Sequence, residues 1–109
     1  IKDDHIFRIG PKIETHHLFP KKVNVEFIEL ISDNELNMRV WERGSGITMA
    51  CGTGACATAL TTFKKGLTEN NVTVHLPGGK LKIEVKDDDQ LFMTGSAETI
   101  FRGEYTYKY

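Results

Sequence analysis

The stretch Met49-Ala50-Cys51-Gly52-Thr53-Gly54-Ala55-Cys56-Ala57-Thr58-Ala59 places a thiol in a glycine-rich turn that runs directly into a predicted helix. Thr53 is the expected N-cap, because its hydroxyl can accept a hydrogen bond from a first-turn amide. The flanking glycines leave the backbone of the turn open to a ligand. Free first-turn amides and the helix dipole together favour binding of a carboxylate or phosphate.

The positive end of that helix also favours the thiolate form of Cys51. A base beside an anion site suits chemistry on a carbon that bears a carboxylate. Cys56 falls further along the helix among small residues, where an inert packing thiol is expected. A Gly-x-Gly turn also closes many strand–helix connections without any function, so the turn alone leaves both interpretations open.

The helix itself is predicted from about Thr53 to Lys65, with Gly66 as the C-cap residue. It carries no charge before Lys64, and its apolar stripe is expected to be Ala55, Ala59, Leu60 and Phe63. Alanine and threonines occupy the other faces. A helix with so little polar surface is expected to be enclosed on most sides.

Alternating strands are predicted on both sides of this helix. Segments 23–31 and 36–42 form a hairpin around the Ser32–Glu35 turn, and further strands are expected at 72–76, 81–85, 91–94 and 97–107. Residues 9–14 are predicted as a turn and an undefined segment, followed by one helical turn at 15–19 before Pro20. The predicted fold class is α+β, with six to eight short strands in a barrel-like sheet around one central helix.

The 109 residues are expected to form a single domain. A net charge of −1 gives no case for nucleic acid or an acidic membrane surface as a partner. The two cysteines are too few for a disulfide framework, which favours a reducing cytoplasm. The chain opens at Ile1 as though in the middle of a domain, so we expect it to be a fragment of a longer protein.

An ordered set of motifs across residues 9–103 resembles diaminopimelate epimerase. In chain order they are Gly10-Pro11-Lys12-Ile13-Glu14, Phe19-Pro20, Asn24-Val25-Glu26-Phe27, Arg39-Val40-Trp41-Glu42-Arg43-Gly44, Ala50-Cys51-Gly52-Thr53-Gly54-Ala55-Cys56-Ala57, Leu76-Pro77-Gly78-Gly79 and Met93-Thr94-Gly95. Each motif alone is weak, whereas the ordered set is specific. One departure is Ile47, where many family members have glutamate.

The resemblance implies an amino-acid epimerase that uses no metal and no organic cofactor. The family interconverts LL- and meso-diaminopimelate, on the route to lysine and peptidoglycan, and works as a homodimer. Its fold has two similar halves, each a barrel of strands around a helix. The present chain resembles the C-terminal half alone, with the N-terminal domain absent.

Site residues follow from the same resemblance. Cys51 matches one of two catalytic cysteines, and Gly52 and Thr53 match backbone positions that hold the reacting carboxylate. Substrate binding at the distal end is implied for Asn24, Glu42 and Arg43, and the glutamate also affects activity. Without the resemblance, a strand-end ion pair would be the expected role of Glu42 and Arg43.

Two bases on opposite faces of the α-carbon are the simplest way to epimerise it without a cofactor. Cys51 can serve as one base, and no other group in the chain is placed by sequence to serve as the second. The partner cysteine is therefore expected on the N-terminal half. Two alternatives are a proline racemase-like enzyme of the same fold and a non-catalytic carboxylate-binding domain. Distal-end residues argue against the former, because proline has no charged distal end.

Overall fold

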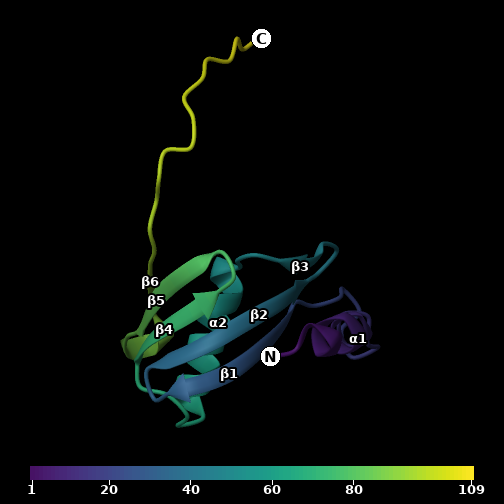
Figure 1. Cartoon of the computed structure of the whole chain (residues 1–109), viewed down its shortest axis with the longest axis vertical. Coiled ribbons are helices and arrows are strands. Elements are labelled where there is room, and N and C mark those ends of the chain that lie inside the picture. The colour runs from purple at the N-terminus through teal and green to yellow at the C-terminus, as the bar shows by residue number, and fades with distance from the viewer.

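A six-stranded sheet and two helices form the chain in the computed structural model, which describes residues 1–109 (Figure 1). A one-turn 3-10 helix at Asp87–Asp89 precedes the last strand. The elements are, in order, α1 (Asp3–Glu14), β1 (Val25–Ser32), β2 (Glu35–Glu42), β3 (Gly46–Thr48), α2 (Gly52–Lys64), β4 (Asn71–Leu76), β5 (Gly79–Val85) and β6 (Leu91–Thr94). The α+β class predicted from sequence is confirmed.

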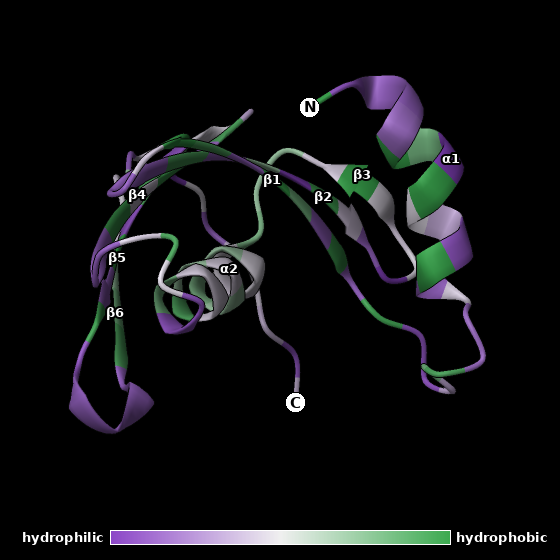
Figure 2. Cartoon of the chain, turned by 90° about the horizontal axis from the view of Figure 1, so that it is seen from below, coloured by the Kyte–Doolittle hydropathy of each residue, from purple (hydrophilic) through white to green (hydrophobic).

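The sheet has the order β1-β2-β4-β5-β6, and β3 pairs with the end of β2. The predicted hairpin is present, because β1 and β2 pair antiparallel. Strands β2 and β4 are parallel, so α2 forms the connection between them. Seen edge-on, the sheet curves around one side of α2 (Figure 2). Strands β1 and β6 end the sheet without pairing with one another, so the barrel expected from sequence is open.

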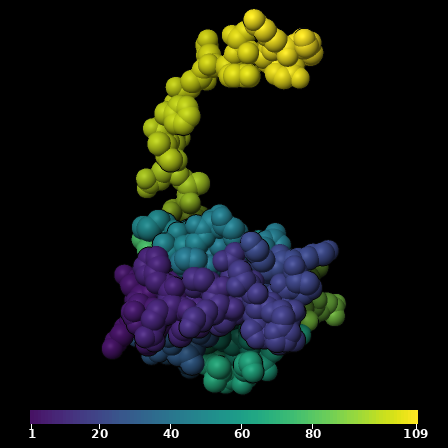
Figure 3. Space-filling view, turned by 90° about the vertical axis from the view of Figure 1, so that its right-hand side faces the viewer, coloured from purple at the N-terminus to yellow at the C-terminus, as the bar shows by residue number.

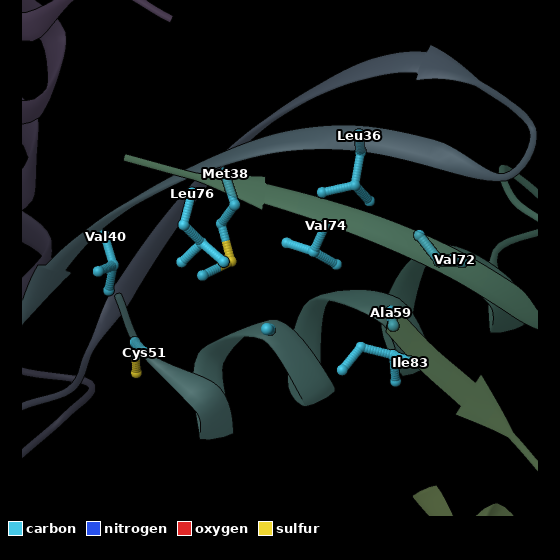
Figure 4. Packing of buried hydrophobic residues seen from close by; sticks show 10 residues of the cluster. Leu36, Met38, Val40, Cys51, Ala59, Val72, Val74, Leu76 and Ile83 are labelled. Carbon is cyan, nitrogen blue, oxygen red and sulfur yellow. The ribbon is translucent and has the colours of Figure 1, made fainter. Parts of the chain in front are cut away.

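The core lies between α2 and the concave face of the sheet (Figure 4). Alternation puts Leu36, Met38 and Val40 of β2 on this face, where each is at most 1% exposed. Neighbouring strands add Val72, Val74, Leu76 and Ile83, and α2 adds Ala55 and Ala59. Alanines on the helix allow close approach to the large side chains of the sheet.

The buried face of α2 differs from the predicted apolar stripe. Thr58 and Thr62 are buried, whereas Phe63 is 40% exposed. The threonines can enter the core because their hydroxyls are satisfied: Thr62 donates to the carbonyl of Thr58, and Thr58 donates to Met38 Sδ. The C-cap residue is Lys65 rather than the predicted Gly66, which follows it in the left-handed conformation. The helix is covered on its sheet side rather than enclosed.

Helix α1 packs on the convex face of β2. Residues 9–14 belong to this helix, so the turn predicted for them is wrong. Pro11 lies in the last part of α1, and the helix continues past it to Glu14. Phe7 meets the ring of Trp41 edge-on at 6.0 Å between centroids. Buried Glu14 accepts hydrogen bonds from Trp41 Nε1 at 2.6 Å and from the backbone N–H of Gly44 at 3.0 Å. Glu14 therefore fixes the turn that follows β2.

These two hydrogen bonds, with that from Gly44 the larger cause, lower the pKa of Glu14. Stability from such a carboxylate is present above its unfolded pKa and is lost as pH falls through the lowered folded pKa. We expect Glu14→Gln to reduce the free energy of unfolding at pH 7 and to differ less from the parent at pH 3. Urea unfolding at both pH values measures this. A difference that stays constant with pH would contradict it.

Two further predictions from sequence are wrong. Residues 15–19 form turns rather than a helical turn, with Phe19 N–H donating to the carbonyl of His16. Residues 97–107 form no strand: they run away from the sheet as an extended tail (Figures 1 and 3). The alternation of Tyr105, Tyr107 and Tyr109 suits a strand, but a strand needs a partner edge and none lies beside the tail. Neither helix has the length and apolar character of a membrane span.

Candidate active site

Cys51 is the N-cap of α2, which corrects the expectation that Thr53 would cap the helix. The backbone of Cys51 is extended, at φ −151° and ψ 103°, and its Sγ accepts a hydrogen bond from the N–H of Gly54 at 3.3 Å. Thr53 lies inside the first turn, with its hydroxyl 3.5 Å from Sγ. The thiol therefore takes the place that a serine or aspartate side chain usually has at a helix start.

The amides of Gly52 and Thr53 have no partner within the helix, because they belong to its first turn. An open hollow of about 700 Å³ lies directly over them. It is lined by Glu42, Cys51, Gly52, Thr53, Cys56, Ala57, Leu91 and Met93. A thiol, free amides and a carboxylate therefore share one hollow, which can hold an anionic group beside Sγ.

Glu42 enters the hollow from the end of β2. Its Oε1 accepts a hydrogen bond from the hydroxyl of Thr48 at 2.7 Å, so β3 orients this carboxylate. Strand β3 is absent from the strands predicted from sequence. It forms because Gly46 to Thr48 turn back and pair with Val40 to Glu42, with Ile47 opposite Trp41.

Asn24 and Arg43 form a separate contact beside the hollow and do not line it. Asn24 Oδ1 accepts from the backbone N–H of Arg43 at 2.8 Å. The Arg43 side chain is exposed, and Nη1 lies 3.4 Å from the carbonyl of Lys21. Glu42 lines the hollow and precedes Arg43 in the chain, so it connects the hollow with the contact between Asn24 and Arg43. The structure thus groups Cys51, Gly52, Thr53 and Glu42, with Asn24 and Arg43 next to them.

Sequence reasoning missed four residues around the thiol: Glu26, Cys56, Leu91 and Met93. The alternation of Val23, Val25 and Phe27 with Asn24 and Glu26 suggests that Glu26 faces away from the core, but its partner across the hairpin is buried Val40, so it faces inward. Burial is the main cause that raises the pKa of Glu26, and the charge of Glu42 adds to it. The side on which Glu26 lies depends on the register of the hairpin. That register is set in part by the turn geometry, which the alternation within one strand does not reveal.

The two thiols are expected to react at different pH. Both are free, and burial raises the pKa of the Cys56 thiol. Cys51 lies at a helix N-terminus, where a thiolate is favoured. We expect iodoacetamide to alkylate Cys51 at lower pH than Cys56, as read by tandem mass spectrometry. Equal pH profiles, or faster labelling of Cys56, would contradict a special environment at Cys51.

The architecture has a counterpart among solved structures. A crystal structure of a phenazine biosynthesis protein of the PhzF family from Bacillus anthracis matches with a TM-score of 0.60. Its sequence identity is 21%, and the match covers 85% of this chain and 30% of that chain. At this identity the likeness shows the fold alone. The chain is thus in the class of α+β proteins that share this curved sheet around a helix.

The family follows from sequence comparison. The model of the diaminopimelate epimerase family matches residues 1–100, and the chain belongs to this family. Relatives named diaminopimelate epimerase are 58% identical over 96 residues in Desulfitobacterium hafniense and 59% over 95 residues in Halothermothrix orenii. The matches cover 88% and 87% of this chain, but 34% and 33% of the relatives. The chain thus spans about a third of their length.

Proposed function

We propose that this chain is part of an epimerase that interconverts LL- and meso-diaminopimelate without a cofactor. The observation that carries the proposal is the position of Cys51 Sγ, at the start of α2 and on the wall of an open hollow. Family membership supplies the reaction class, because the relatives are named for it. The proposal places this activity in the cytoplasm, on the route to lysine and peptidoglycan.

Cys51 is proposed to take the α-proton from one face of the substrate or to return it there. The α-carboxylate would lie on the free amides of Gly52 and Thr53, where the helix dipole also favours it. Those donors would stabilise the negative charge that develops as the proton leaves. A group held by two amides beside Sγ also meets the need for close positioning in a proton transfer.

The distal end of diaminopimelate carries an amino group and a carboxylate. We assign the carboxylate to Arg43, whose planar guanidinium is suited to a two-point contact and is exposed here. Asn24 holds the backbone of Arg43 and so sets where that side chain begins. Glu42, oriented by Thr48, is proposed to bind the distal amino group and to affect proton transfer at the site.

The second base is proposed to be a cysteine on another domain of the longer protein, N-terminal to this one. Cys56 is unsuited to the role because it lies on the same helix, on the same side of the hollow as Cys51. Return of the proton to the opposite face requires a group across the hollow. The full-length protein is proposed to act as a homodimer.

Deuterium exchange separates the chain from the full-length protein. In D₂O we expect the full-length protein to incorporate deuterium at the α-carbon of diaminopimelate and to interconvert the two isomers. The 109-residue chain alone should do neither, because it lacks a second base and an enclosing wall. Proton NMR of the α-position measures both. Exchange by the chain alone would contradict the need for a second domain, and inactivity of the full-length protein would contradict the proposed function.

A further inference from the structure

Glu26 of β1 brings a second carboxylate to the cysteine turn. A Cβ built on Gly54 would lie 2.8 Å from Glu26 Oε1 and 3.1 Å from Cys51 Sγ. The Glu26 carboxylate and the Cys51 thiol therefore converge on the space that a side chain at Gly54 would fill. Gly54 is needed here because the absence of a Cβ lets both groups approach the first turn of α2.

The groups that face Cys51 from its surroundings include no cation. Strand β1 presents Glu26, β2 presents Glu42, and α2 presents Cys56, while β6 contributes Leu91 and Met93. Glu42 is oriented by Thr48, whereas Glu26 has no ion pair and no side-chain donor. Its carboxylate is half-buried against the helix start. No cation neutralises Glu26, and a hydrogen bond with its own backbone N–H only partly offsets the cost of burying its charge.

We propose that Glu26 is a positioning residue that sets the pH at which Cys51 ionises. A negative charge next to Sγ disfavours a second negative charge on the sulfur. This opposes the helix N-terminus, which favours the thiolate. Glu26 and the first-turn amides act in opposite directions on Cys51, and together they set the fraction of molecules in which Cys51 is a thiolate that can accept a proton. The relevance of this thiolate fraction to catalysis rests on the proposed epimerase function.

Partial burial of Glu26 strengthens the effect of its charge on Cys51. Desolvation, more than the neighbouring Glu42, raises the pKa of the Glu26 carboxyl. The same partial exclusion of water that causes this shift also reduces screening between Glu26 and Sγ. A change of charge at Glu26 is therefore expected to alter the reactivity of the nearby Cys51 thiol.

The test measures alkylation of Cys51 by iodoacetamide against pH, in the 109-residue chain, with tandem mass spectrometry to separate Cys51 from Cys56. We expect Glu26→Gln to lower the midpoint of the Cys51 profile by about one pH unit, as removal of a neighbouring charge in a partly screened site would do. Glu26→Asp keeps the charge on a shorter side chain and should give a midpoint between the two. Far-UV circular dichroism checks that each variant is folded.

Glu29→Gln is the matched control, since Glu29 lies on the same strand but on its opposite face, where it pairs with the N-terminus at 2.6 Å. Its Cys51 profile should equal that of the parent. An unchanged or raised midpoint in Glu26→Gln would overturn the proposal. If Glu26→Gln does not fold, Glu26→Ala, which also removes the charge, decides, and a parent-like midpoint there would overturn it. The alkylation assay uses no substrate, so its result is independent of epimerase activity. An inactive full-length protein would refute the proposed function but not the proposed role of Glu26.

Discussion

Replacing Cys51 with serine in the full-length protein should lower kcat/KM for diaminopimelate epimerisation by about 10²- to 10⁴-fold, the share that a positioned acid–base group supplies. A serine hydroxyl keeps the size of the group but is a far weaker acid and rarely carries the negative charge of a base. KM should change little, because the amides of Gly52 and Thr53 and the side chain of Arg43 remain. Steady-state kinetics in both directions measure the loss.

Cys56→Ser is the control for that variant, because Cys56 lines the same hollow from one helical turn further along. It should keep most of the parental activity and stability. A Cys51→Ser protein as active as the parent would remove Cys51 from the mechanism. An equal loss in both variants would point to damage to the fold around α2 rather than to lost proton transfer.

Truncating Ile83 to alanine should cost about 2–5 kcal/mol of the free energy of unfolding. Ile83 is 1% exposed and fills the space between β5 and α2, where the facing residue Ala59 is too small to close a cavity (Figure 4). Domains of this size have a total stability of only about 5–15 kcal/mol. The variant should therefore be close to unfolding, as measured by urea titration of the 109-residue chain.

Leu18→Ala serves as the control for Ile83→Ala, because it removes a large apolar side chain that is 69% exposed. Its free energy of unfolding should stay within about 0.5 kcal/mol of the parent. If Ile83→Ala were equally mild, the core would not lie between α2 and the sheet as described.

Strong local signals made the central helix and most strands predictable. The cysteine–glycine turn, the small residues behind it and Gly66 mark α2 nearly to the residue. The alternation of Leu36, Met38 and Val40 identified the buried face of β2. Each signal works because it involves residues within one turn or one strand.

The errors arose where distant residues decide the outcome. Residues 9–14 belong to a helix that packs on β2, and its last residue Glu14 hydrogen bonds with Trp41 and Gly44, which lie far along the chain. The inward position of Glu26 depends on hairpin register, and a shift of one residue would reverse it. The tail has the alternation of a strand and no edge to pair with. Of the site, the thiol and its amides were predictable, whereas the carboxylate beside Gly54 was not.

A crystal structure of the full-length protein with bound diaminopimelate would show where the α-carbon lies relative to Cys51. We expect Cys51 Sγ at about 3–3.5 Å from the α-carbon, the separation of groups poised to react. We also expect the α-carboxylate to accept hydrogen bonds from the amides of Gly52 and Thr53. Substrate bound away from the start of α2, with Sγ out of reach of the α-carbon, would contradict both expectations.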